Sequence, residues 1–257
     1  MPGHCPQKGS VIMLLRCIQA ENMKLKHSVI YLAFIAIPII PAIMGTFNYL
    51  QNLELLKSSW YSLWTQITLF YASFFYAPLI GIYCSYTWRL EHTHNNWNHF
   101  MSMPVSIVDS YLAKLLCIMK VTILTQLWIS VLYFIGGKLA GLPGIFPPEI
   151  VFWLIRGTLA AAAIASLQLL LSMVIRNFAI PIGIALVGSI AGTLMTNADL
   201  GNFWPYSLMM LGMNSNRNEN VLASMSDTVS YFISVIVFFL LFFGIAIWQL
   251  KTKDVRS

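Results

Sequence analysis

The sequence predicts an all-α membrane protein with six transmembrane helices, and two observations support this class. Of the 257 residues, 58% are hydrophobic and only 9% are charged, whereas soluble domains carry about 25% charged residues. Apolar stretches recur along the chain, and a helix of about 20 such residues crosses the hydrocarbon core of a bilayer. Composition therefore argues against a water-soluble fold. We expect residues 11–257 to form one transmembrane domain.

The amino-terminal region is predicted to have two parts. Residues 1–10 hold two prolines and two glycines without hydrophobic periodicity, so we expect them to be disordered. From Val11 to Lys26, a helix would have an apolar side and a more polar side. The apolar side would hold Val11, Leu14, Leu15, Ile18 and Leu25, and the opposite side Arg16, Ala20 and Lys24. This pattern suits a helix lying in the membrane interface. A simple extension of the first span is the alternative.

The predicted spans cover about residues 28–50, 64–86, 111–135, 151–175, 178–196 and 229–250. Pro38 and Pro41 interrupt the first span, so we expect a kink there. In the fourth span, Gly157, Ala161 and Ala165 recur every four residues, a pattern that lets another helix approach closely.

Two further patterns concern helix packing and the membrane boundary. Gly188 and Gly192 form a GxxxG pair, which we interpret as packing within one helix bundle. Trp60, Tyr61 and Trp64 come at the start of the second span. Aromatic rings are enriched at membrane–water interfaces, so these three are predicted to form an outer aromatic belt.

Residues 197–228 separate the fifth and sixth spans. Their piece FWPYSLMMLGM is apolar but only about half as long as a span, and runs of this length are typical of re-entrant or interfacial segments. We expect a hairpin of two short helices dipping into the outer leaflet, with a polar turn from Asn214 to Asn220. A plain surface loop is the alternative.

Basic residues predict the orientation. With a cytosolic amino terminus, eleven basic residues fall inside and four (Lys57, Lys138, Arg156 and Arg217) fall outside, in agreement with the positive-inside rule. Both termini are therefore predicted to be cytosolic. The four cysteines show no CxxC spacing and are interpreted as apolar packing residues.

A polar island covers residues 88–114, between the second and third spans. It holds Arg89, Glu91, His92, His94, Asn95, Asn96, Asn98 and His99, together with the apolar Trp97, Phe100 and Met101. This mixture predicts a short amphipathic helix outside the bilayer that ends before Pro104, because the residue preceding a proline disfavours helix. We interpret the segment as a docking element for a soluble partner.

Several chemistries lack support in the sequence. There is no GxxxxGK[ST] phosphate loop, so the chain is not expected to hydrolyse nucleotide by itself or to bind a cofactor. His92 and His94 would point to different faces of a helix, which favours a polar patch over a zinc site. No nucleophile, base and orienting group come together, so an enzyme is unsupported.

The chain thus combines six spans, a large cytosolic element between the second and third spans and an outer hairpin before the sixth. This combination resembles the permease subunits of type 2 ATP-binding-cassette exporters, most closely those of lantibiotic immunity and bacitracin-resistance transporters in Gram-positive bacteria. The resemblance is carried by AENMKLKHS (residues 20–28), WYSLWTQITLFYASFFYAPLIGIY (60–83) and EHTHNNWNHFMSMPVSIVDSYLAK (91–114). The last segment is the most specific, with Glu91, Asn96, Trp97, Pro104 and Lys114 matching the family pattern.

The resemblance implies that Arg89 to Met103 form the coupling helix that enters a cleft of the ATPase subunit. Glu91 would meet basic groups of that subunit, and Trp97 with Phe100 would fill an apolar pocket. The implied coupling residues are Arg89, Glu91, His92, Asn96, Trp97, Phe100 and Pro104. The alternative is that Trp97 and Phe100 only anchor the loop at the lipid surface.

The resemblance also implies partners, location and cargo. Two ATPase subunits, using ATP and magnesium, would drive two permeases, identical or paralogous, in the bacterial cytoplasmic membrane. The cargo would be an amphipathic antimicrobial peptide taken from the membrane. The candidate contact residues are Trp60, Trp64, Tyr71, Phe74, Phe75 and Tyr76. Alternatives are an exporter of lipids, polysaccharide precursors or drugs, and a non-transport sensor or lipid-modifying enzyme subunit.

Overall fold

A computed structural model describes residues 7–26, 28, 30–93, 101–102, 104–217, 222 and 224–252. Within these residues the protein is helical and has no β-strand. Six helical runs in this part of the chain are long and apolar enough to cross a membrane: Ile30–Gln51, Ser59–His92, Ile107–Leu139, Glu149–Val174, Ala179–Asn197 and Met225–Thr252. The predicted all-α class with six spans is therefore confirmed.

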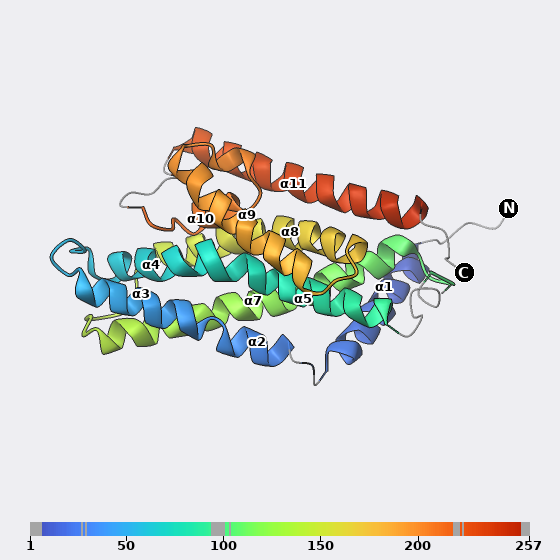
Figure 1. Cartoon of the computed structure of the whole chain (residues 1–257), viewed down its shortest axis with the longest axis horizontal. Coiled ribbons are helices and arrows are strands. Elements are labelled where there is room, and N and C mark those ends of the chain that lie inside the picture. Colours follow the sequence, from blue (N-terminus) through green and yellow to red (C-terminus); the bar gives the residue numbers. More distant parts are fainter. Residues whose placement is uncertain are drawn as a thin grey trace.

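Successive long helices cross one bundle in opposite directions (Figure 1). The helical elements are α1 (Gln7–Leu25), α2 (Ile30–Ala36), α3 (Ile39–Gln51), α4 (Ser59–Phe70), the π-helical turn η1 (Tyr71–Phe75), α5 (Tyr76–His92), α7 (Ile107–Leu139), α8 (Glu149–Val174), α9 (Ala179–Asn197), the 3-10 turn η2 (Gly201–Phe203), α10 (Ser207–Gly212) and α11 (Met225–Thr252). The end of α5 and the start of α7 lie at one end of the bundle together with α1, and α10 lies at the other.

The first span bends where the prolines predicted a kink. α2 ends at Ala36 and α3 begins at Ile39, with a turn at Ile37 and Pro38 between them. Proline has no N–H to donate to the preceding turn and its ring crowds that turn, so the helix breaks there.

The second span differs from the prediction in its length and its middle. It runs from Ser59 to His92 rather than over residues 64–86. Residues 89–92, which we expected to belong to the docking helix, are instead the last turn of α5. The wider π-helical turn at Tyr71–Phe75 was not predicted, and the stacked rings of Tyr71 and Tyr76, 4.7 Å apart, lie at its two ends.

α8 occupies the centre of the bundle, where it contacts α5, α7, α9, α10 and α11. The small residues Gly157, Ala161 and Ala165 are buried on it. A Cβ atom on Gly157 would overlap the Met213 side chain. The predicted close approach at this stripe is therefore confirmed.

The GxxxG pair of α9 packs within the chain, as predicted. A Cβ atom on Gly188 would lie 2.5 Å from Tyr206 Cε2, and one on Gly192 would lie 3.0 Å from Ser207 N. Every residue of α10 is buried. The short helix expected before the polar turn is present, whereas residues 218–221 and 223 lie outside the described part. Insertion of this segment into the outer leaflet stays a prediction.

The predicted aromatic belt is wrong for Trp60 and Trp64. These side chains are 5% and 0% exposed and lie inside the bundle, where both pack edge-on against Tyr133. Their indole N–H groups donate to Pro143 O at 2.7 Å and to Met213 O at 2.8 Å. Because partners for these polar atoms lie inside, the rings need no contact with the membrane interface.

Helix α1 packs along α7. It begins at Gln7, before the expected start at Val11, so residues 7–10 are helical rather than disordered. Of the predicted apolar side, Leu25 is buried and Leu15 is 54% exposed. The position of α1 in a membrane interface stays a prediction.

Candidate coupling site at the end of the second span

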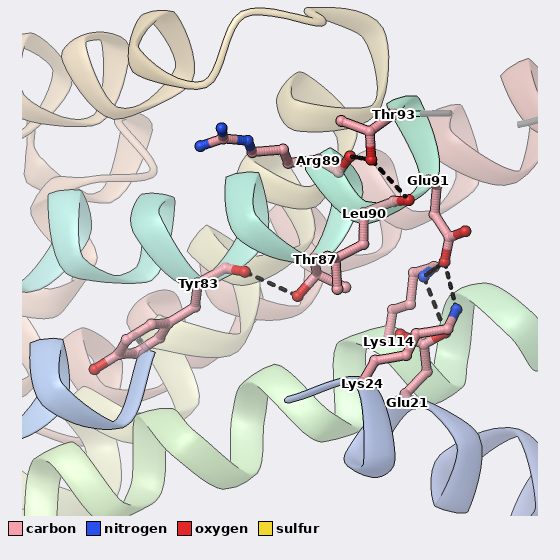
Figure 2. A network of polar contacts seen from close by, with 9 residues as sticks. All are labelled: Glu21, Lys24, Tyr83, Thr87, Arg89, Leu90, Glu91, Thr93 and Lys114. Atoms are coloured by element: carbon pink, nitrogen blue, oxygen red, sulfur yellow. Dashed lines mark hydrogen bonds and ion pairs between the residues drawn. The ribbon is translucent and has the colours of Figure 1, made fainter. Parts of the chain in front are cut away.

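Four charged side chains from three helices meet where α5 ends (Figure 2). We call Glu21 and Lys24 of α1, Glu91 of α5 and Lys114 of α7 the charged cluster. Lys114 Nζ lies 2.7 Å from Glu91 Oε1 and 3.0 Å from Glu21 Oε1. Lys24 Nζ lies 2.5 Å from Glu91 Oε1 and 2.8 Å from Glu21 Oε1. Each lysine therefore contacts both carboxylates.

Most of the charged cluster is shielded from solvent. The exposed fractions of the side chains are 0% for Lys114, 5% for Glu91, 8% for Glu21 and 34% for Lys24. Buried charges are tolerated only when they are paired and hydrogen-bonded, because desolvation is costly. Two acids and two bases balance the formal charge, so the loss of any single one leaves the cluster with an unbalanced charge.

The Lys24 ammonium shows how opposing effects combine here. Burial by itself lowers its pKa, since desolvation disfavours the charged form. The nearby Glu21 and Glu91 carboxylates outweigh burial, and together they raise the pKa of Lys24 above its usual value. Lys24 therefore stays protonated at neutral pH and joins α1 to α5 as a cation.

Local helix geometry brings these groups together. Glu21 and Lys24 are three residues apart on α1 and share one helix face. Glu91 lies in the last turn of α5, which ends at His92. The Thr93 hydroxyl donates to Arg89 O at 3.1 Å and caps a carbonyl at that end. Lys114 lies near the start of α7, which begins at Ile107.

An aromatic pair extends the site to α8. Lys114 Nζ lies 5.2 Å from the centre of the Trp88 ring, within cation–π range. The Trp88 and His92 rings stack at 6.2 Å and 30°. His92 Nε2 lies 3.3 Å from Ser172 O on α8. One turn of α5 thus contacts α1, α7 and α8.

Arg89 extends the site in another direction. Its side chain points away from the charged cluster (Figure 2). Arg89 Cζ lies 5.7 Å from the centre of the Phe178 ring, and Phe178 directly precedes α9. The last turn of α5 is therefore tied to four other parts of the bundle, and it cannot shift without disturbing them.

The predicted coupling residues divide into two groups. Arg89, Glu91 and His92 lie in the last turn of α5 and contact their own chain. In particular, Glu91 faces Lys24 and Lys114, whereas the resemblance implied basic groups of an ATPase. Asn96, Trp97 and Phe100 lie outside the described residues. Met101 and Ser102 are helical and Pro104 lies in a bend, in agreement with a helix that ends before this proline.

The aromatic residues expected to contact cargo also divide. Trp60, Trp64, Tyr71 and Tyr76 are buried within the bundle. Phe74 is 40% exposed and Phe75 is partly buried. Both belong to the π-helical turn. Phe74 and Phe75 are thus the members of the set that present apolar surface outside the bundle.

The charged cluster was missed from the sequence, although two signals could have indicated it. Charged residues are scarce in this chain, and those next to apolar spans tend to be paired. Lys114 matched the family pattern, and an acid–base pair three residues apart closes α1. As for metals, no group of three His, Cys, Asp or Glu side chains that could hold an ion occurs among the described residues.

The fold and this site define a multi-pass membrane protein. We call residues 93–106, between α5 and α7, the polar loop, and the charged cluster holds its base. Residues 17–192 match the family described as "ABC-2 family transporter protein". The match covers more than half of the chain, so the chain belongs to this family. No curated protein and no solved structure matches it. The chain is therefore a membrane permease of an ATP-binding-cassette transporter, the component that works with a separate ATPase.

Proposed function

We propose that this permease expels amphipathic antimicrobial peptides of the lantibiotic type from the bacterial cytoplasmic membrane. Two copies of an ATPase subunit bind from the cytosol, where both chain termini lie, and a second permease, identical or paralogous, completes the exporter. ATP and magnesium act on the ATPase, and this chain converts its movement into exposure of the cargo to the outside.

The ion pair between Glu91 and Lys114 supports the coupling part of this proposal, whereas the peptide cargo rests on the resemblance to lantibiotic immunity permeases. Glu91 precedes the polar loop and Lys114 follows it, so their 2.7 Å contact closes the base of the loop. A loop that delivers force needs a fixed base, because a free base would absorb the movement. Since the last turn of α5 also contacts α8 through His92, a push on the loop reaches several spans.

This arrangement assigns different roles to the two groups of coupling residues. Asn96, Trp97 and Phe100 contact the ATPase, with the two aromatic rings filling an apolar pocket. Arg89, Glu91 and His92 act from behind and position the loop through contacts within their own chain. Pro104 ends the docking helix and leads the chain back to α7.

An apolar groove favours a second candidate cargo. Residues of α8 and α9 line it together with Trp204, Pro205 and Tyr206, and it has a volume of about 670 Å³. Its lining, which includes Leu167, Ile184 and Val187, is almost entirely apolar. Such a groove suits an acyl chain, so a lipid-like substrate is the alternative to a peptide.

The docking role is tested by co-purification of the ATPase with the Trp97→Ala variant. We expect the variant to lose most of the bound ATPase and most of the permease-stimulated ATP hydrolysis. The matched control is Phe203→Ala, since Phe203 is 77% exposed and lies in η2, shortly before α10 at the other end of the bundle. Undiminished binding and hydrolysis in Trp97→Ala would contradict the proposal.

The cargo is tested separately, in cells that express the permease with its ATPase. We expect a higher inhibitory concentration for lantibiotics and no change for a soluble antibiotic. Unchanged inhibitory concentrations across several peptides, together with faster lipid movement in vesicles, would favour the lipid-like alternative.

A further inference from the structure

We propose that the amino-terminal helix α1 belongs to the coupling machinery, with Glu21 and Lys24 as positioning residues that make α5 and α7 move together. This inference rests on the proposed function, because it concerns the way in which movement of the polar loop reaches the spans. It adds a component outside the loop itself.

The first argument is the pattern of contacts in the charged cluster. Glu91 on α5 and Lys114 on α7 are already one pair at 2.7 Å. α1 adds an acid for Lys114, with Glu21 at 3.0 Å, and a base for Glu91, with Lys24 at 2.5 Å. α1 therefore contacts both sides of the loop base, with a lysine on the α5 side and a glutamate on the α7 side. The ion pair between α5 and α7 would exist without these two contacts, so they add a link between α1 and both helices.

The second argument is that α1 follows α7. Lys120 Nζ donates to Asn22 Oδ1 at 2.9 Å, and Cys117 Sγ lies 3.7 Å from Ile18 O. Together with Lys114 and Glu21, these contacts extend over about two turns of α7. α1 and α7 thus form one unit, and the bond from Lys24 to Glu91 attaches the end of α5 to that unit.

The third argument concerns burial. Glu91 is 5% exposed, so moving α5 away from α1 and α7 would leave its carboxylate among apolar groups without either lysine. Glu21 contributes to this cost, because its Oε1 contacts both lysines and holds them beside Glu91. Burial therefore favours movement of α5 together with α1 and α7.

The test compares transport per ATP hydrolysed in proteoliposomes of the complete complex. Glu21→Gln keeps the shape of the side chain and removes its charge from α1. We expect normal co-purification of the ATPase and sustained ATP hydrolysis, with transport per ATP at least fivefold lower. The matched control is Glu149→Gln at the exposed start of α8, which should leave the ratio unchanged.

A variant with all four charges reversed distinguishes a coupling role from a purely structural one. The variant Glu21→Lys, Lys24→Glu, Glu91→Lys and Lys114→Glu keeps the sign of every pair in the cluster. We expect it to recover most of the transport per ATP that Glu21→Gln loses, with a similar thermal midpoint. A ratio in Glu21→Gln equal to that of the unaltered protein, at equal thermal midpoint, would overturn the inference.

Cross-linking gives a second readout that does not depend on removing a charge. The variant carries Asn22→Cys and Lys120→Cys together with Cys5→Ser and Cys17→Ser, and a short bifunctional maleimide bridges positions 22 and 120. Because α1 and α7 move as one unit, we expect transport per ATP to stay within twofold of the uncross-linked sample. Loss of transport on cross-linking would contradict the inference, whereas failure of the unaltered chain to bind any ATPase would contradict the proposed function instead.

Discussion

Glu91 and Lys114 meet inside the protein at 2.7 Å, and the lysine side chain has no exposed surface. These two residues frame the polar loop, so their contact makes the loop a closed element on the bundle. A tether of this kind requires both charges, because the loss of either one leaves an unbalanced charge in the buried cluster.

The buried lysine of this pair should matter far more for stability than the partly exposed lysine beside it. Lys114→Met leaves two carboxylates with Lys24 as their cation and should cost about 3–5 kcal/mol of unfolding free energy. Lys24→Met should cost about 1 kcal/mol or less, since its side chain is 34% exposed. Denaturation in detergent measures both, and equal losses would contradict the assigned burial of Lys114.

The exposure of Phe74 and the burial of Trp64 predict opposite phenotypes. Phe74→Ala should change unfolding free energy by less than about 1 kcal/mol, and it should lower resistance to the cargo if Phe74 contacts it. Trp64→Ala removes a ring that is 0% exposed and should cost about 3–5 kcal/mol. Thermal midpoints and inhibitory concentrations for both variants separate packing from contact with cargo. A large loss of stability in Phe74→Ala would show that its ring is a packing residue.

Glycine substitutions test the close approach of the first two spans. A Cβ atom on Gly45 would overlap Ile67 Cα and lie 2.6 Å from Ile67 N, which is backbone and cannot swing aside. Gly45→Ala should therefore push α3 from α4 and cost about 1–3 kcal/mol. Gly183→Ala is the control, because a Cβ atom there meets nothing within 4 Å. Equal stability of the two variants would contradict the observed helix contact.

Features set by local chemistry could be predicted from the sequence. The spans follow from the length of the apolar stretches, the break near Pro38 follows from proline geometry, and the packing of Gly188 follows from the small size of glycine. Each of these depends on residues close together in the chain. The sequence also predicted that helix ends before Pro104, in agreement with the helical Met101 and Ser102 and the bend at Pro104.

Features set by long-range contacts could not be predicted in this way. The direction of the Trp64 ring depends on Met213 O, which lies 149 positions away in the sequence. The contact between Lys114 and Glu21 joins residues 93 positions apart. Hydrophobic periodicity identifies the exposed and buried faces of a helix, but it does not identify the residue on another helix that receives a given polar atom.

The π-helical turn at Tyr71–Phe75 had no local signal in the sequence, and a pair of deletions tests it. A π-helical turn holds one residue more than the α-helical turns beside it. Deleting Phe74 should therefore convert it to α-helix while α4 and α5 keep their faces, so the variant should still bind the ATPase. Deleting Leu79 instead, within the regular part of α5, should rotate everything after it by about 100°. Glu91 would then turn away from Lys114, and the complex should not assemble. Thermal midpoint and ATPase co-purification measure the difference, and equal damage from both deletions would show that the turn is not an inserted residue but an essential part of the packing.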